Sequence, residues 1–320
     1  MIRILVNDGI EADGQLLLEE AEFEVITEPV AQENLPKELP KYDVIIVRSA
    51  TKIRKELIDL CPNLKVIARG GVGLDNIDVE YAQSKGITII NTPGASTRSV
   101  AELSMGHIYA LSRRLHRSKL EMSKDKSDFK ALKSEYSKGN EIAGKTIGII
   151  GFGRIGQEIA KLAMGSNMRI MPYDPYVDDT ILHFNIFGNN NLNLSLKVYT
   201  IGLEQVLKNS DFISLHLPMV KGKPIIGPDE IAKMKDGVFL LNCARGGAID
   251  ETALLEGLNS GKIGGAGLDV FENEPNPNKA LINHPNVSVS PHIGGSTAEA
   301  QNKIATELAD RIINHFGRDI

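Results

Sequence analysis

The chain has 320 residues, of which 42% are hydrophobic, and it carries a formal net charge of −5 at pH 7. This length is typical of about two globular domains, and the acidic balance argues against a nucleic-acid partner. Neither the apolar core of an amino-terminal signal nor an apolar run of the ~18 residues that a membrane span needs is present, so we expect a cytoplasmic protein without a membrane segment. Cys61 and Cys243 are not spaced as metal ligands, so we expect no disulfide and no metal site.

Short runs rich in β-branched residues alternate with possible helices in the first part of the chain. The runs are residues 2–7, 23–27, 44–49, 65–69 and 88–92. Such alternation predicts a parallel sheet with helices on both faces, in a flavodoxin-like arrangement. The first turn, Asn7-Asp8-Gly9, lacks a phosphate-binding glycine pattern.

A small, polar segment at residues 94–98 follows, and we interpret it as a hinge. The pattern Ser99-x-x-Glu102 is typical of a capping box, and it predicts the start of a long helix through Leu115. The basic stretch 113–117 is followed by interleaved acidic residues, which favours a solvated helix face over a polyanion site.

A second series of strands follows this helix. The runs are residues 146–150, 168–174, 211–218, 237–244, 265–270 and 287–292, the number of strands in a complete dinucleotide-binding sheet. A second capping-box pattern, Ser296-x-x-Glu299, opens a final helix that we expect to run to about residue 315 and to pack back on the first domain. The predicted fold is α/β, with two doubly wound parallel-sheet domains. A Rossmann dinucleotide-binding domain (98–290) is inserted into a flavodoxin-like substrate domain (1–97 and 291–320).

The dinucleotide signal lies at the first strand of the second series. GFGRIG places Gly151, Gly153 and Gly156 between a strand and a helical pattern, as in the turn that brings backbone amides against a pyrophosphate. Alone, this motif is weak, because glycines are common at helix starts. Asp174 ends the next strand, where an acid accepts both hydroxyls of the adenine ribose and repels a 2′-phosphate. The sequence therefore predicts NAD rather than NADP.

Polar stretches end three later strands, and ligands of doubly wound sheets bind at such ends, so we expect the active site in the cleft between the domains. Hydride transfer on a hydroxy acid needs a cation, a proton donor and acceptor, and a group that orients it. Arg245, His292 and Glu274 supply these types. Singly, each has a structural interpretation, as a surface cap, a buried histidine and a loop residue. The stretches are NCARGG (242–247), DVFENEP (269–275) and SPHIGGST (290–297).

These motifs, at these intervals after GFGRIG, resemble the D-2-hydroxyacid dehydrogenase family over essentially the whole chain. VRSATK (47–52), ARGGVGLDNID (68–78) and TPGASTRSVAEL (92–103) are most similar to its phosphoglycerate dehydrogenases. The resemblance implies NAD-dependent oxidation of 3-phospho-D-glycerate to 3-phosphohydroxypyruvate, the step that leads into serine biosynthesis, by a homodimer formed through the long helix. Because the chain stops at Ile320, feedback inhibition through a serine-sensing domain is not expected.

The resemblance also implies residue roles. Arg245 would hold the substrate carboxylate and C2 oxygen, His292 would exchange the hydroxyl proton, and Glu274 would pair with His292. Implied cofactor contacts are Val72, Gly151, Gly153, Arg154, Ile155, Gly156, Asp174, His216, Leu217, Pro218, Cys243, Ala244, Asp269, Gly294 and Gly295. Implied substrate contacts, for a phosphorylated 2-hydroxy acid, are Arg48, Ser49, Arg69, Gly70 and Gly71.

Two other interpretations stay open: a glyoxylate or hydroxypyruvate reductase of the same family, and a non-catalytic, NAD-sensing protein of the co-repressor kind. The remaining histidines are better explained by packing or solvent than by catalysis; they include His107, His116 and His315. His183 lies in an asparagine-rich segment, residues 181–200, that departs from the family pattern. We interpret Cys243 as a small buried residue, since hydride transfer needs no thiol.

Overall fold

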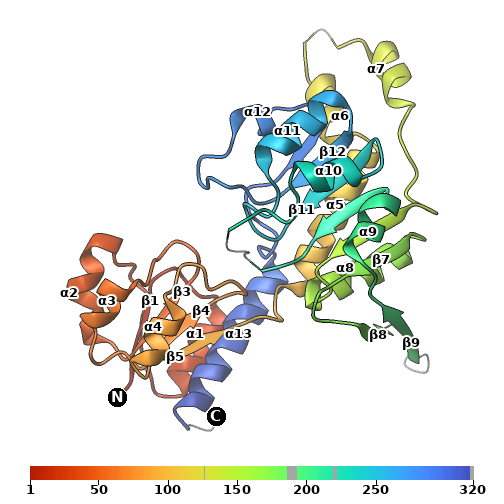
Figure 1. Ribbon diagram of the computed structural model, residues 1–320. Coiled ribbons are helices and arrows are strands. Elements are labelled where there is room, and N and C mark those ends of the chain that lie inside the picture. The colour runs from red at the N-terminus through yellow and green to blue at the C-terminus, as the bar shows by residue number, and fades with distance from the viewer. Residues whose placement is uncertain (126, 186–192, 219–221, 318–320) are drawn as a thin grey trace. The chain divides into compact units, whose positions relative to one another are not determined.

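The computed structural model describes residues 1–125, 127–185, 193–218 and 222–317, and it divides into two compact units (Figure 1). Unit 1 comprises Met1–Thr97 and Gly295–Ile320, and unit 2 comprises Arg98–Gly294. The return to unit 1 thus falls at Gly295 rather than at residue 291. The reason is local, because the amides of the two preceding residues, Ile293 and Gly294, are bound by a carboxylate of unit 2.

Unit 1 contains a five-stranded parallel sheet in the order β2-β1-β3-β4-β5. Its strands are β1 (Arg3–Val6), β2 (Glu24–Ile26), β3 (Val44–Val47), β4 (Val66–Arg69) and β5 (Thr88–Asn91). Successive side chains enter separate cores on the two faces, as in β3, where all four residues are buried. The helices are α1 (Ala12–Glu20), α2 (Leu35–Glu38), α3 (Lys55–Asp59), α4 (Val79–Ser84) and α13 (Ala298–His315). The predicted flavodoxin-like sheet is therefore confirmed.

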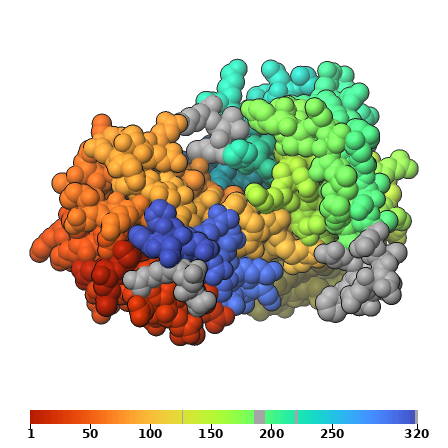
Figure 2. Space-filling view, turned by 90° about the horizontal axis from the view of Figure 1, so that it is seen from below, coloured from red at the N-terminus to blue at the C-terminus, as the bar shows by residue number. Residues whose placement is uncertain are grey.

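The last helix, α13, covers one face of this first sheet, as the sequence predicted. Leu308 and Ile312 join the core formed by alternate residues of β1, β3 and β4. A Cβ at Gly14 of α1 would lie 2.6 Å from the carbonyl oxygen of Ala305, so the two helices approach closely at this glycine. Figure 2 shows the blue carboxy-terminal helix against the red amino-terminal residues.

The predicted N-cap of α13, Ser296, was wrong by one residue. Its N-cap is Thr297, whose side chain accepts a hydrogen bond of 3.1 Å from the amide of Ala300, so Ser296 lies before the helix. Adjacent Ser and Thr residues offer the same kind of capping oxygen, so the sequence pattern could not distinguish between them.

Unit 2 contains a six-stranded parallel sheet in the order β13-β12-β11-β10-β6-β7. Its strands are β6 (Thr146–Ile150), β7 (Arg169–Tyr173), β10 (Phe212–Leu215), β11 (Val238–Asn242), β12 (Ile263–Leu268) and β13 (Val287–Val289). All six predicted strands are present, and the chain changes direction across the sheet between β6 and β10. This change creates the topological switch point at which doubly wound sheets bind ligands. The helices around the sheet include α8 (Arg154–Gly165), α9 (Leu203–Asn209), α10 (Pro228–Lys233), α11 (Glu251–Ser260) and α12 (Lys279–Ile282).

The long helix predicted after the hinge is broken in two. The first part, α5, is Thr97–Ser112, and the left-handed residue Arg114 (φ 55°) separates it from α6 (Leu115–Met122). Ser99 is buried inside α5 rather than capping it, so the capping-box prediction was wrong. A further helix, α7 (Phe129–Tyr136), precedes the sheet.

The asparagine-rich segment forms an antiparallel hairpin of β8 (Asp179–Asn185) and β9 (Asn193–Tyr199); residues 186–192 lie outside the described residues. Leu182 and Val198 pack into the core of unit 2. His183 lies on the exposed side, 3.0 Å from the hydroxyl of Ser195. The hairpin is therefore a separate two-stranded sheet beside the six-stranded one, rather than the short strand and loop of the family pattern.

Candidate active site

The glycine turn after β6 has the conformation that a dinucleotide requires. Gly151 has φ 93°, and a Cβ there would lie 2.4 Å from the carbonyl oxygen of His216. A Cβ at Gly156 would lie 2.1 Å from the carbonyl oxygen of Gly151, so this contact also requires glycine. Gly153 caps α8 with nothing within 4 Å of its Cβ position, which leaves the backbone open to a ligand. These three features fit a pyrophosphate at the helix start.

Asp174 is held beside this turn. It follows β7, and its carboxylate accepts 2.7 Å from the amide of Phe152 and 2.9 Å from the amide of Tyr176. Arg154 and Ile155 form the first turn of α8, next to the open glycine. The turn and the acid come from adjacent strands, β6 and β7, and their arrangement fits the pyrophosphate and the adenine ribose of NAD.

His216 lies on the opposite side of the switch point, directly after β10. Its Nε2 is 2.8 Å from the hydroxyl of Ser214, and burial lowers the pKa of its imidazole, so it stays neutral near pH 7. Leu217 packs against the core of unit 2, and Pro218 is exposed. This short segment is suited to forming a wall of a cofactor cleft rather than to moving protons.

The turn that carries Arg245 is closed by the side chain of Asn242, at the end of β11. Its amide donates to the carbonyl of Arg245 at 2.8 Å, and its oxygen accepts from the amide of Ala244 at 3.1 Å. The half-buried guanidinium of Arg245 donates to the carbonyl of Ala244 at 2.7 Å. Cys243 is buried, which raises the pKa of its thiol to about 12, so it has the structural character that the sequence suggested.

His292 and Glu274 lie together at the next strand ends. Nδ1 of His292 is 2.7 Å from one carboxylate oxygen of Glu274, whose other oxygen accepts 3.0 Å from the amide of Phe271. His292 has φ 56°, a left-handed conformation that is uncommon outside glycine. Half of its side chain is exposed, so its ring remains accessible to a substrate.

Asp269 shapes the turn on which His292 sits. Its buried carboxylate accepts 2.9 Å from the amide of Ile293 and 2.8 Å from that of Gly294. The hydroxyl of Ser290 donates to it at 2.6 Å, and its backbone carbonyl accepts from the amide of His292 at 2.8 Å. The carboxylate of Asp269 therefore stabilises this turn. The sequence predicted Asp269 only as a cofactor contact and did not predict this structural role.

Two of these turns are in close contact, which was not predicted from the sequence. A Cβ at Gly246 would lie 1.9 Å from the carbonyl oxygen of Phe271, so the backbones touch here. Glu251 and Glu272 add a reciprocal pair of bonds, each carboxylate accepting from the other's amide at 2.8 and 3.3 Å. Burial beside Glu272 raises the pKa of Glu251. The first Gly of NCARGG, Gly246, was the only sequence signal for this contact.

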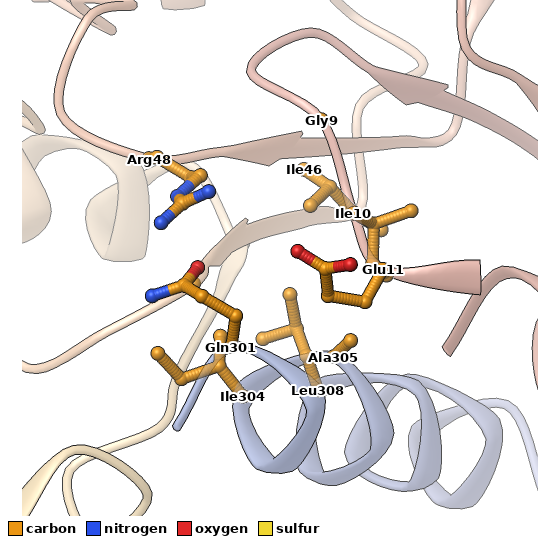
Figure 3. A pocket seen from close by; sticks show the side chains of 10 residues that line it. Gly9, Ile10, Glu11, Ile46, Arg48, Gln301, Ile304, Ala305 and Leu308 are labelled. Carbon is orange, nitrogen blue, oxygen red and sulfur yellow. The ribbon is translucent and has the colours of Figure 1, made fainter. Parts of the chain in front are cut away.

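In unit 1, Arg48 follows β3, and its amide donates to Asp8 at 2.7 Å. Arg48, Glu11 and Gln301 line a small pocket between the sheet and α13, and their polar ends point toward the same space (Figure 3). Gln301 also donates to the carbonyl of Gly295 at 2.6 Å. The pocket lies at the carboxyl ends of β1, β3 and β4, the ligand-binding side of such a sheet.

The other predicted substrate and cofactor contacts in unit 1 lie on nearby loops. Ser49 is exposed beside Arg48. The guanidinium of Arg69 folds back on its own loop and donates to the carbonyl of Gly70 at 3.1 Å. Gly71 has φ 134°, and its amide donates to a threonine hydroxyl at 2.8 Å; Val72, which follows, is 37% exposed.

Comparison with known proteins gives a consistent result. Residues 105–294 match the family described as D-isomer specific 2-hydroxyacid dehydrogenase, NAD binding domain. The chain is 46% identical to the hydroxypyruvate reductase of Thermotoga maritima over 98% of each chain. It is 42% identical to the D-3-phosphoglycerate dehydrogenase of Methanocaldococcus jannaschii, covering 98% of this chain but 57% of that protein. The glyoxylate reductase structure from Paecilomyes thermophila superimposes with a TM-score of 0.80 at 29% identity, over 100% of this chain and 97% of the other.

Proposed function

The chain belongs to the D-isomer specific 2-hydroxyacid dehydrogenase family, and we propose that within it the protein reduces hydroxypyruvate and glyoxylate. It is an NAD-dependent D-2-hydroxyacid dehydrogenase. The observation that carries the proposal is the match to the Thermotoga hydroxypyruvate reductase over nearly the whole of both chains. The sequence motifs alone had favoured 3-phospho-D-glycerate as the substrate.

The pocket around Arg48 supports an unphosphorylated substrate. Glu11 presents a carboxylate to the same space, and a carboxylate repels a phosphate dianion. A hydroxymethyl group, by contrast, can donate to Glu11 and accept from Arg48 or Gln301. The pocket is therefore better suited to the neutral end of hydroxypyruvate than to a phosphate.

We assign the catalytic roles to the residues at the strand ends of unit 2. Arg245 binds the substrate carboxylate and the C2 oxygen, because its planar guanidinium suits paired oxygen acceptors. His292 donates a proton to the C2 oxygen during reduction, and Glu274 orients its ring through Nδ1. Bound NADH supplies the hydride.

We assign the remaining cofactor and substrate contacts from the similarity to the family. Gly151, Gly153, Arg154, Ile155 and Gly156 would hold the pyrophosphate. Asp174 would hold the adenine ribose. Further cofactor contacts would come from Val72, His216, Leu217, Pro218, Cys243, Ala244, Asp269, Gly294 and Gly295, and substrate contacts from Arg48, Ser49, Arg69, Gly70 and Gly71.

Assembly and location are part of the same proposal. Leu115, Leu120, Met122 and Phe129 are large apolar residues exposed on α6 and at the start of α7, and a homodimer would bury them. Within the described residues, no helix is long and apolar enough to cross a membrane. A cytoplasmic location remains an expectation from the sequence.

Oxidation of 3-phospho-D-glycerate is the second candidate. It is favoured by the identity to the Methanocaldococcus enzyme and by the cation that Arg48 brings to the pocket. Because this chain covers little more than half of that relative, the similarity concerns only part of its length.

A substrate panel tests the proposal. NADH consumption is followed with hydroxypyruvate, glyoxylate and 3-phosphohydroxypyruvate, and NAD reduction is followed with 3-phosphoglycerate. We expect the highest kcat/KM for hydroxypyruvate. A higher kcat/KM for 3-phosphohydroxypyruvate would favour the second candidate, and bound NADH without turnover of any of these would refute both.

A further inference from the structure

A buried chain of hydrogen bonds leads from α5 to the turn of His292. His107, on α5, is 5% exposed, and both of its ring nitrogens have partners. Its Nδ1 lies 2.9 Å from the hydroxyl of Ser288, and its Nε2 lies 3.0 Å from the hydroxyl of Ser290. The hydroxyl of Ser290 in turn donates to Asp269 at 2.6 Å.

Asp269 determines which atom donates and which accepts in each of these hydrogen bonds. Because the single hydroxyl proton of Ser290 is given to the carboxylate, Ser290 must accept from His107. His107 therefore carries its proton on Nε2, and its bare Nδ1 accepts from Ser288. Burial lowers the pKa of His107 despite the opposing charge of Asp269, and His116 lowers it further, which keeps the ring in this neutral form.

The fold makes room for this histidine. Gly267 lies on β12, and a Cβ at this position would be 2.7 Å from Cβ of His107. A larger residue on the strand would push the helix away from the sheet and lengthen the bonds to β13. The helix, the strand and the two serines thus hold one ring at one position.

We propose that His107 is a positioning residue for His292, acting through Ser290 and Asp269. Asp269 receives Ser290 on the same oxygen that accepts the amide of Ile293, and its backbone carbonyl accepts from the amide of His292. A donor at Nε2 of His107 holds the Ser290 hydroxyl in line with Asp269. This holds the left-handed turn of His292 in register with Glu274. The proposal rests on the proposed role of His292.

A matched pair of variants tests it. The amide nitrogen of Gln reaches the position of Nε2, whereas the amide of Asn reaches only that of Nδ1. His107→Gln should therefore keep kcat close to that of the wild type, and His107→Asn should lower kcat roughly 10- to 100-fold, as expected for a misplaced catalytic group. The NADH dissociation constant is measured by fluorescence in both variants, and kcat is compared at saturating NADH.

Substitutions of Ser290 test whether His107 acts through this residue. Ser290→Thr keeps the hydroxyl and should keep kcat, while Ser290→Ala should lower it. In the Ser290→Ala background, replacing His107 by Asn or by Gln should give the same kcat, since the connection is already broken. Active-site concentrations are set by NADH titration, so that any loss of folded protein does not count as a loss of kcat.

Two results would overturn the proposal: equal kcat for His107→Asn and His107→Gln in the otherwise wild-type enzyme, or an undiminished difference between them in the Ser290→Ala background. A separate variant, His292→Gln, distinguishes this from a failure of the proposed function. Undiminished kcat in His292→Gln would refute the role of His292 itself.

Discussion

Nδ1 of His292 lies 2.7 Å from Oε2 of Glu274, while Oε1 of Glu274 accepts from the backbone amide of Phe271. The carboxylate is thus shared between a ring nitrogen and the turn that precedes it. His292 is held from its other side by the carbonyl of Asp269. Backbone contacts thus hold both Glu274 and His292 in place, although half of the histidine side chain is exposed.

Glu274→Gln should lower kcat for keto-acid reduction. An amide has one accepting oxygen, so either the amide of Phe271 or Nδ1 of His292 loses its acceptor. We expect a loss of roughly 10- to 100-fold, within the range of a general acid's contribution. Steady-state kinetics with hydroxypyruvate measure it, with the exposed Glu256→Gln as control. A kcat within twofold of wild type would show that this pairing does not support catalysis.

Asp174→Asn should relax discrimination against NADP. The oxygen of Asn can still accept from the amide of Phe152, although the amide of Tyr176 then loses its acceptor, and the charge is removed. Since like charges brought together cost several kcal/mol, the ratio of kcat/KM for NADPH to that for NADH should rise at least about tenfold. An unchanged ratio would mean that Asp174 does not face the ribose.

Glu11→Gln should improve use of the phosphorylated keto acid. Removing this carboxylate leaves Arg48 as the charged group of the pocket, so kcat/KM for 3-phosphohydroxypyruvate should rise about tenfold, while that for hydroxypyruvate changes little. Arg48→Gln removes the positive charge instead and serves as the control; it should lower kcat/KM for 3-phosphohydroxypyruvate. If Glu11→Gln leaves both values unchanged, the pocket does not receive the end of the substrate.

Gly246→Ala should destabilise the protein and lower its activity together. Its Cβ would lie 1.9 Å from the carbonyl oxygen of Phe271, so the turns of Arg245 and Glu274 would be forced apart. Overpacking of this kind costs about 1–3 kcal/mol. Urea unfolding measures the change, and Gly165→Ala, at a helical site with open space, is the matched control that should be neutral or stabilising. Equal stability of the two variants would contradict the contact.

Stability should decline in mild acid, partly through His107. Burial lowers its pKa in the folded state, whereas in the unfolded chain it titrates near 6.5, so the unfolded state binds the proton first. This contribution is therefore fully present above about pH 6.5 and is lost as pH falls below it, by up to about 1.4 kcal/mol per pH unit. Unfolding free energies at pH 7.5 and 5.5 should differ less in His107→Gln than in wild type. His183→Gln, on the exposed side of the hairpin, should behave as wild type, and an identical pH dependence in all three would exclude this contribution.

Much of the fold could be predicted from local patterns. Strands of parallel sheets are buried on both faces, so Val44–Val47 and Thr146–Ile150 are recognisable as short apolar runs without any tertiary information. GFGRIG was equally informative, because tight backbone contacts at Gly151 and Gly156 exclude side chains at those positions. Helix boundaries were less reliable: the patterns at Ser99 and Ser296 suggested caps, but neighbouring backbone conformations decided where the helices begin.

The doubly wound architecture, the glycine turn and the residue types of the catalytic set can be inferred from local sequence, because each depends on neighbours within one strand, turn or helix. The contacts that support the catalytic set are visible only in the folded chain. His107 and Ser290 are far apart in the chain, yet their side chains meet at 3.0 Å, and Gly246 reaches Phe271 across two turns. Such contacts arise when sheet order and helix packing bring distant segments together, and no periodicity along the chain records that pairing.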